Sequence, residues 1–69
     1  MIFNYSKLLG RIRECGFTQA TLAKAIGINK STLSAKLNNQ YHFTQPEIIA
    51  ICKVLSIVHK DIPLYFYAV

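Results

Sequence analysis

Acidic residues are scarce in this sequence, with three Asp and Glu against eight Lys and Arg, which gives a net charge of +5. The 69 residues also include only three glycines, two cysteines and two histidines. The sequence contains no glycine-rich phosphate loop, no pair of catalytic carboxylates, no Ser/His/Asp set and no constellation of metal ligands. We therefore expect a protein that is not an enzyme and that uses no cofactor and no metal.

The two cysteines, Cys15 and Cys52, lack the spacing of a metal site, and each lies on an apolar helical stripe. Two buried thiols in a cytosolic protein are therefore expected rather than a disulfide. The longest apolar run, residues 48–58, contains a lysine and is too short to span a bilayer. No signal peptide is recognised, because Asn4 and Ser6 interrupt the apolar start of the chain.

Apolar residues make up 52% of the chain, which is too high a fraction for a disordered protein. Sixty-nine residues form one small domain, so we treat residues 1–69 as a single unit. Such a domain buries a modest core and cannot easily hide so much apolar surface. An apolar interface with a partner subunit is therefore expected.

The basic residues are concentrated in the first half of the chain. Six of the eight lie within residues 1–36, where Glu14 is the single acid. This asymmetry suits binding to a polyanion, because each neutralised phosphate releases counterions. The alternative is that these are the solvated charges of a small basic domain. Arg11 and Arg13 are open to both interpretations.

Residues 18–39 read as two short helices joined by a glycine turn. Leu22 and Ile26 lie four positions apart, so they share one face of the first helix, which Thr18 can cap. Gly27 ends this helix, because glycine adopts the left-handed conformation without a Cβ penalty. The pattern predicts a compact pair of helices that cross closely.

The second helix of this pair spans residues 30 to about 38, and the Asn29 side chain is expected to cap it. Leu33 and Leu37 form its buried stripe. Its opposite side is small or polar and carries no acid, which is unusual for a helix that faces only water. Those outer residues are Lys30, Ser31, Ser34, Ala35 and Asn38.

Three further helices are predicted around this pair. The first runs to about Cys15, with Asn4 or Ser6 as its cap. Another begins at a capping box formed by Thr44 and Glu47 and runs to about residue 56. A last short helix or turn follows Asp61. The expected fold is therefore all-α, with four to five short helices around one core.

The end of the chain, residues 59–69, is strongly apolar. Either this tail completes the core of the monomer, or it forms a contact between two copies of the chain, helix on helix or as an added strand. We take the second alternative as the prediction, which makes the chain a homodimer. The residues assigned to the dimer interface are Leu64, Tyr65, Phe66 and Tyr67.

The pair of helices resembles the helix-turn-helix of the lambda-repressor and Cro family (XRE-like) of phage and bacterial regulators. The residues that match in order and spacing are Gln19, Leu22, Ala23, Ile26, Gly27, Ile28 and Leu33. The whole chain also looks like the short Cro-like regulators of temperate phages of Gram-positive bacteria. One position departs from the family, which usually has an apolar residue three places after Leu33, where this chain has Lys36. We expect Lys36 on the flank of the helix, near phosphate or water.

The resemblance implies a sequence-specific regulator of transcription that binds double-stranded DNA. It would act as a Cro-like repressor by occupying an operator, in the cytoplasm of a bacterial host. The second helix of the pair would lie in the major groove, while Gln19 would contact a phosphate and brace Lys30. The predicted DNA-binding residues are Gln19, Asn29, Lys30, Ser31, Ser34, Ala35, Asn38 and Asn39.

A second function from another class is a protein-interaction module. In this alternative the helix-turn-helix domain binds another regulator, as an antirepressor or antitoxin does, through its aromatic tail. Two sets of substitutions distinguish the two functions. Loss of activity on substitution of Lys30 and Asn38 would indicate DNA binding, and loss on substitution of the tail would indicate protein binding.

Overall fold

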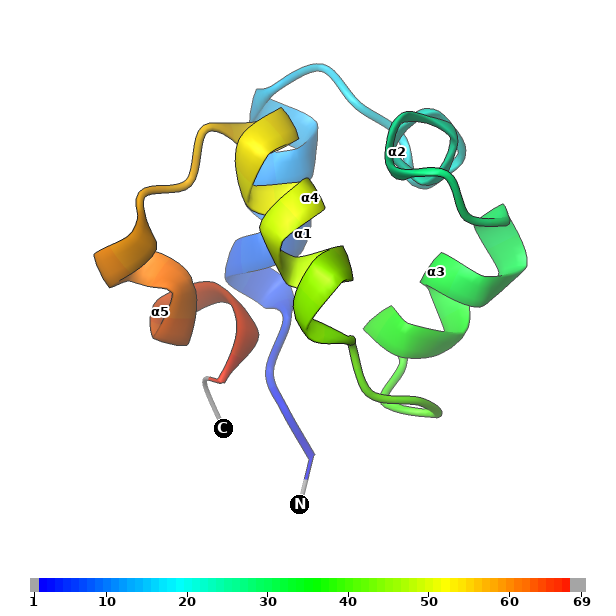
Figure 1. Cartoon of the computed structure of the whole chain (residues 1–69). Coiled ribbons are helices and arrows are strands. Elements are labelled where there is room, and N and C mark those ends of the chain that lie inside the picture. Colours follow the sequence, from blue (N-terminus) through cyan, green and yellow to red (C-terminus); the bar gives the residue numbers. More distant parts are fainter. Residues whose placement is uncertain (1, 68–69) are drawn as a thin grey trace.

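The computed structural model describes residues 2–67, whose regular structure consists of five α-helices and a short 3₁₀ turn. Every regular element of the described residues is a short helix, so the expected all-α architecture is confirmed (Figure 1). Their bounds are α1 Ser6–Glu14, α2 Gln19–Ile26, α3 Lys30–Leu37, α4 Gln45–Leu55 and α5 Ile62–Phe66, with the 3₁₀ turn η1 at His59–Asp61.

The helices are arranged around α1 and α4, which occupy the middle of the view in Figure 1. α2 packs against both α3 and α4, while α5 packs against α1 and η1. α3 and α5 therefore lie on opposite flanks of the molecule (Figure 1). Surfaces built on these two helices face different surroundings.

All five helices contribute fully buried side chains to the core, with Phe66 from α5. Leu8 of α1, Leu22 of α2, Leu33 of α3 and Leu55 of α4 each have an exposed fraction of 0%. These leucines lie on the stripes that the helical periodicity predicts. Burial of each side chain contributes roughly 2 kcal/mol, so this set is the main source of cohesion between the helices.

Local signals fix most of the helix ends as expected. Gly16 and Gly27 both adopt positive φ, at 79° and 80°. Thr18 caps α2 and Thr44 caps α4, each through its side chain. Asn29 is the N-cap residue of α3, but its side chain makes no capping hydrogen bond, so that part of the prediction is wrong.

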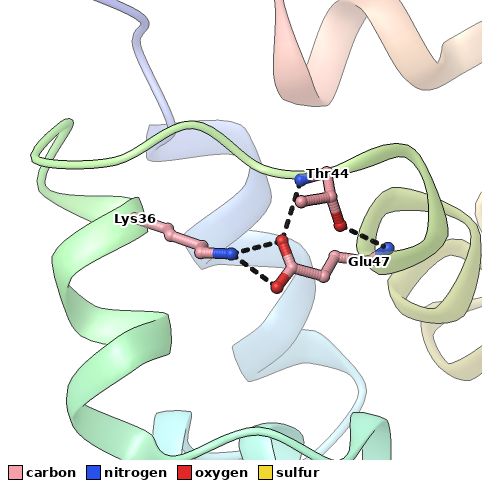
Figure 2. Close-up of polar contacts among 3 residues, drawn as sticks. All are labelled: Lys36, Thr44 and Glu47. Carbon is pink, nitrogen blue, oxygen red and sulfur yellow. Dashed lines mark hydrogen bonds and ion pairs between the residues drawn. The ribbon is translucent and has the colours of Figure 1, made fainter.

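A buried ion pair joins α3 to the start of α4 (Figure 2). Lys36 has an exposed fraction of 8%, and its ammonium lies 2.5 Å from both carboxylate oxygens of Glu47. The expectation that Lys36 lies on the flank near phosphate or water is therefore wrong. Lys36 is therefore a buried residue of α3, and its charge is neutralised by the Glu47 carboxylate.

Glu47 is held in place for this pair by the cap of its own helix. The backbone N–H of Thr44 donates to the Glu47 carboxylate at 2.8 Å, and the Glu47 N–H donates to the Thr44 hydroxyl at 3.3 Å (Figure 2). Burial raises the pKa of Glu47, but the hydrogen bonds from Lys36 and Thr44 outweigh it, so the pKa lies below its ordinary value. The carboxylate that pairs with Lys36 is therefore charged, and its position is fixed by the cap.

Asn39 ties the beginning of the chain to the end of α3. Its side-chain oxygen accepts from the Phe3 N–H at 2.8 Å, and its side-chain nitrogen donates to the Phe3 carbonyl at 2.9 Å. Asn39 has a φ of 64°, a conformation that asparagine tolerates better than most residues. The amide that the sequence assigns to DNA therefore already has two partners within the protein.

Aromatic side chains extend this link to the tail. Phe66 packs edge-on against Phe43 at 5.4 Å between ring centroids, Phe43 against Tyr5 at 5.5 Å, and Phe3 against Tyr67 at 6.2 Å. Phe66 has an exposed fraction of 2%, so it belongs to the core of the monomer. Its assignment to a dimer interface is wrong, because no surface of Phe66 is free for a second copy.

Arg11 closes the other end of α4. Its Nε donates to the Leu55 carbonyl at 3.0 Å, and the Cys15 thiol lies 3.7 Å from the same oxygen. The last carbonyls of a helix have no partner within it, so Arg11 satisfies one of them. Its role is therefore structural, in addition to a surface ion pair with Glu14 at 3.6 Å.

We predict that Lys36→Met destabilises the protein by on the order of 1–3 kcal/mol, because the half-buried Glu47 carboxylate would lose its charged partner. Urea unfolding followed by circular dichroism measures this loss. Lys24→Met is the matched control, since Lys24 is exposed on α2, and it should change the free energy of unfolding by less than about 0.5 kcal/mol. Equal stability of the Lys36→Met variant and the wild type would contradict this role.

The Glu47 pKa predicts how stability responds to acid. The folded pKa is lowered, so Glu47 contributes stability above its ordinary pKa of 4.5, and this contribution is lost as the pH falls through the folded pKa. The free energy of unfolding measured from about pH 7 to about pH 3 should therefore fall less in Glu47→Gln than in the wild type. Glu14→Gln, which alters an exposed carboxylate, should retain the wild-type fall. Parallel curves for Glu47→Gln and the wild type would refute the assignment.

Candidate functional site

The α2–α3 pair begins with a reciprocal cap. The Thr21 N–H donates to the Thr18 hydroxyl at 3.1 Å, and the Thr18 N–H donates to the Thr21 hydroxyl at 2.8 Å. Gln19 follows as the first residue of α2 and is half-buried. Within residues 2–67, no hydrogen bond joins Gln19 to Lys30, so the expected bracing of Lys30 is not seen.

The turn between α2 and α3 is set by Gly27 and Ile28. In the left-handed conformation of Gly27, the Ile28 N–H donates to the Ala23 carbonyl at 3.0 Å. Ile28 is half-buried and packs against the core, while Ala23 is 1% exposed. The small Ala23 side chain lies at the centre of the domain, as the close crossing of the helices requires. This turn fixes the direction in which α3 leaves α2.

α3 presents one side to the core and the other to solvent. Leu33, Lys36 and Leu37 are buried. The outer side comprises the exposed Lys30, Ser31 and Asn38 with the half-buried Ser34 and Ala35. The Asn38 side-chain amide donates to the Ser34 hydroxyl at a long 3.4 Å. The structure thus brings five of the eight predicted site residues together on one surface, which we call the α3 face.

The α3 face is free of acidic side chains. Glu14 ends α1, Glu47 lies in α4 and Asp61 ends η1, and these are the three acids of the chain. Glu47 is neutralised by Lys36, and Glu14 pairs with Arg11. The face therefore offers Lys30 as its charge, with hydroxyl and amide groups beside it as hydrogen-bond donors and acceptors.

Of the other three predicted DNA-binding residues, Asn29 is the exposed N-cap of α3, directly beside Lys30, whereas the remaining two differ from it. Asn39 is held by Phe3, and Gln19 lies at the start of α2. In the tail, Leu64 and Tyr67 are exposed at 44% and 46%, and Tyr65 is half-buried. The sequence missed the internal role of Asn39, which a pattern of helical periodicity cannot reveal.

Neither a cluster of metal ligands nor a membrane-spanning helix is found among residues 2–67. Within residues 2–67, no three His, Cys, Asp or Glu side chains come together as metal ligands would. Burial raises the pKa of the Cys52 thiol, and Cys15 and Cys52 are both free. In the described part of the chain, no helix has the length and apolar character needed to cross a membrane.

Comparison with known proteins adds a family and a relative. A family model described as "Protein of unknown function (DUF739)" matches residues 1–69. The chain is also similar to the solution structure of the modulator of repression (MOR) of the temperate bacteriophage TP901-1 from Lactococcus lactis. The sequence identity is 40% and the TM-score 0.82, over 97% of this chain and 90% of that chain. No curated protein matches the chain.

These findings bear on the resemblance that the sequence suggested. A phage regulator is indeed among the similar proteins, and it shares the fold over nearly the whole chain. The matching family model is DUF739, so membership of the lambda-repressor and Cro family stays a prediction. The same holds for the DNA-binding residues and for the homodimer.

We predict that the polar side chains of the α3 face contribute little to stability. The double variant Lys30→Ala/Asn38→Ala should unfold within about 0.5 kcal/mol of the wild type, since both residues are exposed. Leu33→Ala, at a fully buried position on the opposite side of α3, should lose about 2–5 kcal/mol. Denaturant titration measures both, and a large loss in the double variant would mean that these residues serve the fold rather than a partner.

Proposed function

The chain belongs to the family described as protein of unknown function (DUF739), and we propose that it modulates repression in a phage by binding another regulatory protein. The observation that carries this proposal is its similarity to a phage modulator of repression, at 40% identity over 97% of the chain. The two proteins share their fold over this length, with a TM-score of 0.82.

The proposed mechanism is competition for the repressor. A small protein that binds the free repressor more tightly than the operator-bound repressor lowers the fraction of operator that is occupied. Such a protein needs a binding surface and no reaction centre, which agrees with the chemistry of the described residues. The partner is then a repressor of the same phage, and the site of action is the cytoplasm of the host.

A second candidate function is direct binding to operator DNA. The acid-free α3 face favours it, because Lys30 can reach guanine O6 and N7 or a phosphate, and Ser31 and Ser34 can donate to base edges or accept from them. Ala35 would meet a thymine methyl, and Asn38 the backbone. A homodimer would read two half-sites about one helical turn, roughly 34 Å, apart.

One titration separates the two functions. A labelled operator duplex is saturated with the phage repressor, the chain is added, and the bound fraction is followed by fluorescence anisotropy and by mobility in a gel. We expect the wild-type chain to lower repressor occupancy while the chain alone leaves the duplex unbound at the same concentrations. Lys30→Ala/Asn38→Ala, which is the matched variant of the α3 face, should keep this activity.

The opposite result would support direct binding. In that case the chain alone binds the operator, its affinity falls steeply with salt, and Lys30→Ala/Asn38→Ala weakens binding. An effect on repressor occupancy that requires the α3 face and DNA binding by the chain itself would overturn the protein-contact proposal.

A further inference from the structure

An apolar groove lies between α4 and the η1–α5 segment. Figure 1 shows that α5 lies on the flank of the molecule away from α3. Its volume is about 490 Å³, and Ile49, Ile62, Pro63 and Tyr67 contribute its apolar lining. A smaller hollow of about 180 Å³ shares Ile49 and Ile62 and continues along α4. Concave apolar surfaces of this kind are the usual sites of binding.

The groove exposes side chains that the core leaves out. Ile49 lies off the buried stripe of α4 and is 51% exposed, and Tyr67 at the end of α5 is 46% exposed. Isolated apolar residues on a surface need no explanation, but these two line one concavity. Together with Ile62 and Pro63 they form a continuous apolar surface that a partner could cover.

The rim of the groove is basic. Lys60 and His59 line the main groove, and Lys53 lines the adjoining hollow. Asp61 is the one acid of the η1–α5 segment, and it is not among the residues that line either part. A second copy of this chain docked here in a symmetric dimer would bring two basic rims together, and like charges in an interface are costly. A partner with acidic flanks would be attracted instead.

The secondary structure around the groove determines which kind of partner segment fits it. The described residues contain no strand, so strand addition to a sheet edge is not available there. A groove between two helical segments takes an amphipathic helix with anchors at i, i+3, i+4 and i+7. α4 has 11 residues, so the groove matches a partner helix of about three turns.

We infer that this groove binds an amphipathic helix of a partner protein, with the apolar stripe of that helix against Ile49, Ile62 and Tyr67 and its acidic flank against Lys53 and Lys60. The identity of the partner as the phage repressor rests on the proposed function, whereas the chemistry of the groove does not. Tyr67 and Ile62 belong to the region in which the sequence predicts an interface, but the partner inferred here is not a second copy.

The test uses the full chain labelled with ¹⁵N and three ligands. The ligands are the purified phage repressor, a synthetic amphipathic helical peptide with leucine anchors and glutamate flanks, and the same peptide with lysine flanks. The variants are Ile49→Glu and Lys53→Glu/Lys60→Glu.

Each variant has a matched control. Ile2→Glu changes an isoleucine that is 77% exposed and lines neither part of the groove. Lys7→Glu/Lys24→Glu changes two exposed lysines of α1 and α2. Amide spectra show which variants are folded.

The expected result is that the repressor and the acidic peptide shift the amides of Ile49, Ile62 and Tyr67. Both groove variants should bind about tenfold more weakly or worse, while both controls bind as the wild type does. If Ile49→Glu fails to fold, Lys53→Glu/Lys60→Glu decides by the same criterion.

Failure of the two proposals looks different. If the repressor binds the wild type and both groove variants equally, the groove is overturned and the proposed function stands. If the repressor does not bind the wild type, the proposed function fails, and binding of the two peptides then decides whether the groove proposal holds. Shifts at the groove with the acidic peptide and not with the basic one support the groove, whereas shifts with both or with neither overturn it.

Discussion

The pairing of Lys36 with Glu47 fixes how α3 sits against the start of α4. It places a charge inside a small domain, where a hydrophobic residue would be the simpler solution, and it binds α3 to the first turn of α4. Glu47 serves two purposes, because the same carboxylate accepts from the Thr44 backbone and completes the cap of α4. The position of α3, and with it the α3 face, is therefore coupled to the start of the helix that carries the groove. The pair withdraws one lysine together with one acid, so the remaining charged residues still carry the net charge of +5.

The two candidate surfaces divide the molecule. The α3 face is polar, small-sided and basic, whereas the groove beside α4 is apolar with a basic rim. Between them, the aromatic contacts from Phe66 through Phe43 to Tyr5 fill the space around the beginning and the end of the described chain. Tyr67, which lines the groove, contacts the ring of Phe3, and Asn39 holds the Phe3 backbone at the end of α3.

The local features of the fold could be predicted from the sequence, and the long-range ones could not. Helical periodicity and the caps at Thr18 and Thr44 locate the helices, and Gly27 locates the turn, because each signal acts within a few residues.

The contacts that the sequence could not predict are long-range. The prediction for Lys36 is wrong because its partner lies 11 positions away in the sequence, and the hydrogen bond from Asn39 to Phe3 joins residues 36 positions apart. A clue to the first error was present, since Lys36 stands at a position that is usually apolar in the helix-turn-helix family that the sequence resembles. Phe66 was assigned to an interface because composition alone does not tell which aromatic residues of a tail turn inward. The α3 face was predicted residue by residue, but the same surface chemistry suits a nucleic acid or a protein, so the sequence could not choose between these partners.

We propose that the chain acts by binding a protein partner rather than by binding DNA itself. Isothermal titration of the purified chain into the phage repressor, with no DNA in the cell, tests this claim most directly. The account predicts a saturable complex of defined stoichiometry whose affinity is preserved in Lys30→Ala/Asn38→Ala. Absence of binding to the repressor, together with tight and salt-sensitive binding of the chain to the operator duplex, would contradict it.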